Sequence, residues 1–307
     1  MNAKANAIPN NSDQPKKRNP KKVDAKKINE SDIQPRRMDF EFDPAINRYW
    51  FADDQFKTIL LTALSSTFPE GERFFVRSVR HYQNALTSKK LKEEVKGFIG
   101  QEAHHGNEHE VFNAFLRDKG IPTDIVEKFV YNGIRWQEKR LSPARRLAKT
   151  CALEHFTAML AELILENPEF IEGMDERLVP LWMWHAVEES EHKSVAFDVF
   201  QDQVDNYWVR TSEMAMTTVE FLGFTIFHYI QLRREMDDKT DWKAVRSGIS
   251  WLIGRKGWLN QLRPAYLAYF KRDFHPAKRD KKHLRDAGLK QLAKMLNKPE
   301  LAQGLPH

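Results

Sequence analysis

Apolar residues recur at helical spacing along most of the chain from Met38 onward. The period-two alternation of a half-buried strand is almost absent, so the sequence predicts an all-α fold. Proline, glycine and capping residues divide this region into helices. The predicted helices cover 52–87 with a kink near Pro69, the stretch from Ser88 to just before Gly120, 123–139, Ser142 to Asn167, 175–205, 211–236 and 242–270. At least four of them are about 25–35 residues long, which indicates a helical bundle with additional C-terminal helices.

The first 37 residues have a different composition, which is polar, rich in Asn, Pro and Lys, and without aromatic residues. Such a segment buries too little apolar area to offset its ordering entropy, so we predict a disordered basic tail over 1–37. We expect a metal-binding bundle over 38–236 and a helical extension with a basic tail over 237–307.

Charge is concentrated near the two ends of the chain. The net charge is +6, and residues 1–37 hold ten Lys or Arg against four Asp or Glu. Residues 271–290 hold eight basic and three acidic side chains. The single cysteine, Cys151, excludes a disulfide framework, and the N-terminal region lacks the apolar core of a signal peptide. We therefore expect a cytoplasmic protein, with peripheral contact to the inner membrane as an alternative.

Glutamate and histidine occur together at metal-ligand spacing in two predicted helices. The stretch WHAVEESEH places His185, Glu189 and His192 on one helical stripe, because each residue advances about 100° around the helix. The stretch QEAHHGNEH repeats the E-x2-H spacing with Glu102 and His105. A single E-x2-H motif usually marks a solvated helix face. Two such motifs in one chain favour a metal site.

Two isolated glutamates supply the acids that a dinuclear site still needs. Glu72 and Glu154 each lie among apolar residues, and Glu70 is a rival to Glu72. The gap from Glu72 to Glu102 is 30 residues and that from Glu154 to Glu189 is 35, which suits two antiparallel hairpins that meet at one level. Four buried carboxylates would be neutralised by two divalent cations. Oxygen and imidazole donors favour iron or manganese, with zinc as a further alternative.

The motifs FPEGERFFVRSVR, FIGQEAHHGNEHEVFN, CALEHFTAML, WHAVEESEHKSVAFDVF and FHP resemble a bacterial family labelled predicted metal-dependent hydrolase, over most of residues 40–275. The constellation also resembles ferritin-like di-iron proteins, which implies a ferritin-like four-helix bundle. The additional His185 is similar to the extra histidine ligand of p-aminobenzoate N-oxygenase-type di-iron enzymes. Carried over residue by residue, these resemblances imply the metal ligands Glu72, Glu102, His105, Glu154, His185, Glu189 and His192.

The family label does not fix the reaction. We expect an oxidase or oxygenase that activates O2 and needs an electron donor, with no catalytic residue distinct from the metal centre. The alternatives are a hydrolase that activates a metal-bound water and a non-catalytic metal-binding or storage protein. The expected substrate is a small or lipid-like organic molecule. The residues expected to contact and orient the ligands without binding metal themselves are His109, Glu188, Cys151, Arg73 and Arg77.

The apolar stretch from Met214 to Leu232 borders on the length of a membrane span but contains Glu220 and His228. We interpret it as a helix that packs on the bundle, with membrane-surface contact as the alternative. The basic run 271–290 would then meet anionic headgroups, or would simply be solvated. Self-association into a homodimer is a further expectation, and no specific nucleic acid is expected.

Overall fold

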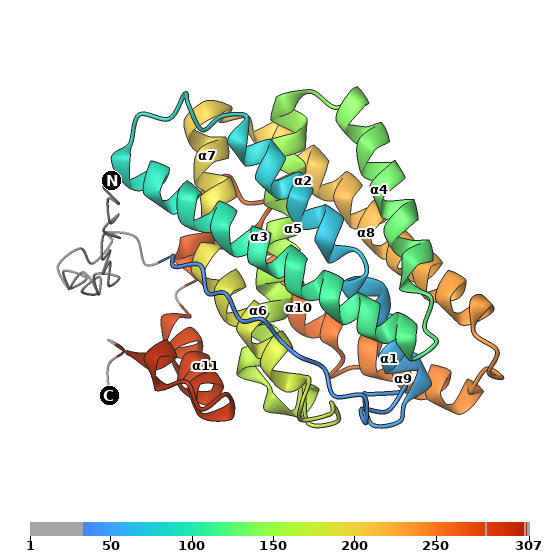
Figure 1. Cartoon of the computed structure of the whole chain (residues 1–307). Helices are drawn as coiled ribbons and strands as arrows, with labels where there is room; N and C mark the ends of the chain where they lie inside the picture. The colour runs from blue at the N-terminus through green and yellow to red at the C-terminus, as the bar shows by residue number, and fades with distance from the viewer. Residues whose placement is uncertain (1–32, 280, 304, 306–307) are drawn as a thin grey trace, which may run out of the picture. The chain divides into compact units, whose positions relative to one another are not determined.

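The computed structural model describes residues 33–279, 281–303 and 305 (Figure 1). In this part of the chain the regular structure is helical, and the only β-type pairing is one bridge between Phe51 and Met174. This confirms the all-α prediction. The α-helices are α1 Gln55–Ser65, α2 Phe68–Arg80, α3 Lys89–Asp118, α4 Thr123–Arg140, α5 Pro143–Glu166, α6 Val179–His192, α7 Val195–Gln203, α8 Tyr207–Glu235, α9 Trp242–Ile253, α10 Trp258–Ala268 and α11 Lys282–Met295.

Short polar side chains begin several of these helices, and Ser88 and Ser142 do so where the sequence predicts. Asp54, Ser88 and Ser142 each accept a hydrogen bond from a backbone N–H in the first turn of α1, α3 and α5. Gly120, with φ of +78°, follows the end of α3, where a left-handed residue is needed. Asn167 closes α5 before a proline. These local signals account for the agreement between expected and observed ends.

Three of the predicted helices are each two helices in the structure. The segment 52–87 is interrupted at Ser66 and Thr67, because Pro69 lies in the first turn of α2 and cannot continue the hydrogen bonds of α1. The segment 242–270 is interrupted by the turn between Gly254 and Gly257. The segment 175–205 is interrupted after His192, where Lys193 donates to Glu162 and to a distant carbonyl oxygen.

The core of the bundle is formed by α2, α3, α5 and α6. The hairpins α2–α3 and α5–α6 are its closest pairs, and α2 also packs on α5 and α3 on α6. This arrangement is consistent with the expected ferritin-like bundle. Figure 1 shows α3 running across the front of α5 and α6.

Two apolar clusters lie along the bundle, with a polar layer between them. One cluster contains Trp50, Phe112 and Trp182, and the other contains Phe98 and Phe200. Helix α3 contributes to both, and its buried glutamates and histidines lie between Phe98 and Phe112. Burial of each large apolar side chain contributes about 1.5–3 kcal/mol. The polar layer is therefore stabilised from both ends by apolar packing.

The segment 33–42, which we call the N-terminal strap, lies along α3 and α6 without helical structure. Glycines on α3 make room for it, because a Cβ at Gly97 would lie 2.6 Å from the Ile33 carbonyl oxygen. The backbone N–H groups of Asp39 and Phe40 donate to the Glu108 carboxylate. Most of the predicted tail, residues 1–32, lies outside the described residues, and 33–37 belong to this strap.

The C-terminal helices pack on the bundle. Helix α8 packs on α5 and α1, α10 packs on α5, and α11 packs on α6. Only one face of α8 is buried, because Met214 and Leu232 are inaccessible whereas Val219 is 75% exposed. The stretch expected to pack on the bundle therefore does so on one side only. Within the described residues no helix has the length and apolar character needed to cross a bilayer.

Candidate metal centre

The two E-x2-H motifs face each other across the bundle. Glu102 and His105 lie on α3, and Glu189 and His192 lie on α6. The Nε2 of His192 lies 3.0 Å from Glu102 Oε1, and the Nδ1 of His105 lies 3.6 Å from Glu189 Oε1. Divalent ions hold nitrogen and oxygen ligands at about 2.1 Å, so two ligands of one ion lie roughly 3–3.5 Å apart. The separations across this interface fit shared ions.

The isolated glutamates approach the same layer from α2 and α5. Glu72 Oε1 lies 3.8 Å from Nε2 of His185, and Glu154 Oε2 lies 3.5 Å from Nε2 of His192. Both carboxylates are buried, with 3% and 2% of their surface exposed. Glu70, the rival to Glu72, instead pairs with Arg73. The structure therefore brings together all seven side chains that the sequence predicts as ligands.

Ligand atoms gather at two points in the polar layer. Each point offers three atoms that lie within 4.8 Å of one another. The two groups are Glu72 with His105 and His185, and Glu102 with Glu189 and His192. Glu154 adjoins the second group through His192. Two points of convergence match two metal ions.

The hydrogen bonding of these residues is incomplete in a way that metal ions would satisfy. Both carboxylate oxygens of Glu72 and Glu154 are buried without a hydrogen-bond partner, and so is the Nδ1 of His105. An uncompensated buried carboxylate costs several kcal/mol. Five of the seven ligand candidates have unpaired buried atoms in this layer, which fits cations.

The pKa values of the ligand candidates in the metal-free chain also indicate that these buried groups lack a compensating charge. Burial, and then repulsion from Glu102, raises the pKa of Glu72 well above its usual range. Burial also raises the pKa of Glu154. Burial and the neighbouring His185 hold the pKa of His105 well below its usual range, so its ring is neutral. A neutral imidazole is the form that binds metal, and the protonated glutamates would release protons when ions enter.

A chain of hydrogen bonds behind His185 fixes its tautomer. Ser65 donates to the side-chain oxygen of Asn113 at 2.8 Å, and therefore accepts from the Nδ1–H of His109 at 2.8 Å. His109 Nε2 then accepts from the Nδ1–H of His185 at 2.7 Å. The Nε2 of His185 is left without a proton and faces Glu189 at 3.1 Å. His185 can therefore bind a metal ion through Nε2.

A second set of side chains lies behind the other two histidines. Glu188 Oε2 lies 3.2 Å from the Nε2 of His105, and Gln101 accepts from Nδ1 of His192 at 3.0 Å. Gln101 in turn donates to Glu191 at 2.7 Å. These contacts leave Nδ1 of His105 and Nε2 of His192 facing the ligand layer. Such carboxylate–histidine and amide–histidine pairs orient metal ligands.

Arg36 of the N-terminal strap joins these two sets. Its guanidinium donates to Glu188 at 3.1 Å and, through both terminal nitrogens, to Glu191 at 2.7 Å. The side chains of Glu188 and Glu191 are 0% and 2% exposed, so the strap supplies the positive charge that these buried carboxylates require.

The other residues expected to support the ligands lie elsewhere. Arg73 and Arg77 form ion pairs with Glu110 and Glu138 on the outer side of α2. Cys151 is buried in an apolar cluster, and burial raises the pKa of its thiol, so it stays protonated. Of the predicted supporting residues, His109 and Glu188 contact ligands directly.

Five supporting residues were not identified from the sequence: Ser65, Asn113, Gln101, Arg36 and Thr157, which donates to Glu189. Gln101 directly precedes the ligand Glu102, and a polar side chain beside a ligand was the one available signal. Ser65 and Asn113 lie in apolar helix stretches, where a polar side chain needs a buried partner. Arg36 carries no local signal, since it lies in a polar stretch before the first helix.

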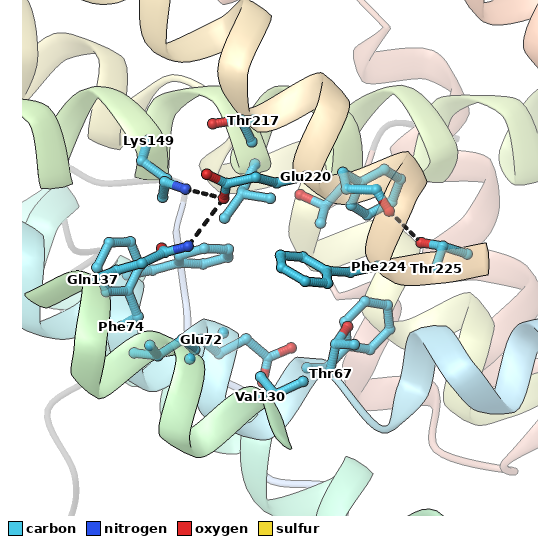
Figure 2. A pocket seen from close by; sticks show the side chains of 18 of the residues that line it. Thr67, Glu72, Phe74, Val130, Gln137, Lys149, Thr217, Glu220, Phe224 and Thr225 are labelled. Atoms are coloured by element: carbon cyan, nitrogen blue, oxygen red, sulfur yellow. Dashed lines mark hydrogen bonds and ion pairs between the residues drawn. The ribbon is translucent and has the colours of Figure 1, made fainter. Parts of the chain in front are cut away.

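A cavity of about 250 Å³ lies beside the metal ligands, between α2, α4, α5 and α8 (Figure 2). Glu72 and Glu189 line it, and most of the remaining wall is apolar and aromatic. Figure 2 shows the Glu72 carboxylate turned toward the open space, opposite Phe224. On another wall Lys149 forms an ion pair with Glu220. The cavity provides an apolar chamber that reaches the ligand layer.

A close contact at Gly106 offers a test of how Glu72 is positioned. A Cβ at this position would lie 3.2 Å from Glu72 Oε2 and 3.6 Å from the Pro69 carbonyl oxygen. We expect Gly106→Ala to displace the carboxylate and to weaken metal binding by on the order of tenfold. Gly133→Ala is the matched control, because its Cβ would meet nothing within 4 Å. Chelator competition measures both affinities, and equal affinities in the two variants would contradict this placement of Glu72.

Comparison with known proteins identifies the family. The family model described as predicted metal-dependent hydrolase matches residues 34–280, a range that contains all seven ligand candidates and Arg36 of the N-terminal strap. No curated protein and no solved structure matches the chain. The match covers most of the chain and confirms the resemblance seen in the sequence. The chain therefore belongs to the predicted metal-dependent hydrolase family.

Proposed function

We propose that this protein is a two-metal enzyme that uses dioxygen to oxidise an apolar organic substrate. The observation that supports this proposal is the apolar cavity that ends at Glu72 and Glu189, two of the seven converging ligand candidates. Four carboxylates and three imidazoles suit iron or manganese. Iron in this ligand set would supply the redox chemistry for dioxygen reduction, with electrons from an external donor.

The side chains around the cavity have separate tasks in this proposal. Phe74 and Phe221 exclude water and bind the apolar part of the substrate. Thr157 donates to Glu189 Oε2 at 2.5 Å and fixes the orientation of that carboxylate at the cavity wall. The substrate's reacting carbon would lie near Glu72 and Glu189, where the ligand layer meets the cavity.

Hydrolysis is the second candidate function, and the family description favours it. Hydrolysis of an ester or amide needs a group that stabilises negative charge on the substrate oxygen. Lys149 is the one lysine or arginine among the described residues lining the cavity, and it is paired with Glu220. A hydrolase would therefore have to rely on the metal ions alone for this task, which is why we place oxidation first.

Oxygen uptake distinguishes the two reactions. Metal-free protein is loaded anaerobically with Fe(II), and air is then admitted. We expect oxygen consumption in proportion to bound iron and a new near-ultraviolet absorption band, both absent with Zn(II). No uptake, together with ester hydrolysis by the zinc-loaded protein, would replace this proposal with the hydrolase. Bound metal without either activity would indicate a binding or storage protein.

A further inference from the structure

The outward face of α8 is apolar over about four turns of helix. Val219 and Ile226 are 75% and 61% exposed, and Met216, Leu222 and Ile230 are each at least 40% exposed. The one charged residue between 216 and 230 is Glu220, which pairs with Lys149 at the cavity wall. At 1.5 Å per residue this stripe is roughly 20 Å long. A soluble surface rarely carries such a stripe unless it meets a partner.

Neighbouring helices extend this apolar face. On α4, Phe129 packs edge to face against Phe224 of α8, and on α10, the Tyr266 hydroxyl lies 3.0 Å from the Thr218 hydroxyl of α8. Further exposed large apolar side chains on α4, α9 and α10 are Trp136, Trp242, Ile249, Ile253, Leu259 and Leu267. We call the exposed apolar surface of α4, α8, α9 and α10 the α8 face.

Positive charge accompanies the α8 face. Residues 242–272 contain seven Lys or Arg and no Asp or Glu. Among the described residues, exposed Arg246, Arg255, Lys256 and Arg263 have no ion-pair partner within 4.0 Å. Basic side chains interleaved with tryptophan and aliphatic residues are typical of surfaces that lie on anionic lipid.

We propose that the α8 face docks on an anionic lipid bilayer. The positive charge complements phosphate headgroups, whereas a second copy of the chain would bring the same cations together across a two-fold axis. No described helix could cross a membrane, so the contact is peripheral. Phe129, Trp136 and Phe224 are exposed and also line the cavity, so docking would bring the cavity mouth to the lipid surface.

Vesicle co-sedimentation of the full chain tests the docking. We expect binding to vesicles of phosphatidylglycerol mixed with phosphatidylcholine, weaker binding at high salt, and little binding to phosphatidylcholine alone. The double substitution Val219→Glu with Ile226→Glu is expected to reduce binding at least about tenfold, since burial of each aliphatic side chain favours the bound state by about that factor. Arg246→Ala with Arg263→Ala should lower both binding and its salt dependence.

The control variant is Val111→Glu. Val111 is an apolar residue of α3 that is 49% exposed and lies away from the α8 face, so this variant should bind vesicles as the wild type does. Wild-type protein that stays in solution with anionic vesicles would overturn the proposal. So would a wild-type dimer, seen by light scattering, that the α8 double substitution converts to a monomer. The readout does not depend on turnover, so it stands or fails separately from the proposed reaction.

Discussion

A Glu72→Gln variant is expected to bind metal on the order of 100-fold more weakly than the wild type and to lose one of two ions on dialysis. Loss of a residue that only supports a ligand typically costs 10–100-fold, so loss of a direct ligand should reach about the upper end of that range or beyond. Glu72 is suited to this test because neither of its carboxylate oxygens has a hydrogen-bond partner, and Nε2 of His185 is 3.8 Å away. Glutamine keeps the shape and removes the charge.

Glu70→Gln is the matched control, two residues away on the same helix. The Glu70 side chain is 15% exposed and pairs with Arg73 at 2.8 Å, outside the ligand layer. We expect this variant to retain both ions with unchanged affinity. Metal content after dialysis and calorimetric titration measure the difference. If the two variants behave alike, Glu72 is not a ligand.

Glu72→Gln is expected to change the stability of the fold in opposite directions in the absence and in the presence of metal. Without metal, Glu72→Gln should stabilise the fold by about 2 kcal/mol, because burial forces the unpartnered Glu72 carboxyl to take up a proton on folding, whereas glutamine is already neutral. With metal, the wild type should be the more stable, because ions bind the folded state only. Thermal melts with chelator and with metal measure both. If the cluster were instead held together by its own ion pairs, Glu72→Gln would lower the stability with and without metal.

Local signals account for what could be predicted from the sequence. The capping side chains of Ser88 and Ser142 lie within three residues of the groups that they cap, so their effect is visible in the sequence. The spacing of Glu102 and His105 on one helix likewise requires only helical geometry. The agreement of helix ends, and the convergence of the seven expected side chains, rest on such short-range relations and on the family resemblance.

Long-range contacts account for what could not be predicted. Arg36 lies 152 residues from Glu188 in the chain, and no local pattern signals that a polar segment before the first helix will cover two buried carboxylates. The break after His192 is of the same kind, since Lys193 reaches the Arg279 carbonyl oxygen. The exposure of the apolar face of α8 could not be predicted either. The stretch is an apolar run, and the sequence alone does not show which side of a helix other elements cover.

Replacing Arg36 by alanine is expected to destabilise the fold by about 3 kcal/mol at neutral pH, since removal of one partner from a buried ion pair typically costs 3–5 kcal/mol. The Arg36 side chain is 17% exposed, so we expect the lower end of that range. Arg37→Ala is the control, because Arg37 is 73% exposed and its ion-pair partner among the described residues is the exposed Asp39. Denaturant unfolding of both variants measures the difference.

The pH dependence of this loss separates an electrostatic role for Arg36 from simple packing. Burial raises the pKa of Glu188 to about 7 even against the lowering effect of Arg36, and without the guanidinium it should rise further. A carboxyl whose pKa is raised in the folded state destabilises the fold fully above that pKa. This destabilisation is relieved as the pH falls toward the pKa of the same carboxyl in the unfolded state. The loss of stability in Arg36→Ala should therefore be smaller at pH 5 than at pH 8.

The metal affinity of Arg36→Ala should also fall, because Glu188 and Glu191 would no longer hold His105 and Gln101 in place. A loss independent of pH, with unchanged metal affinity, would reduce Arg36 to a packing residue of the strap.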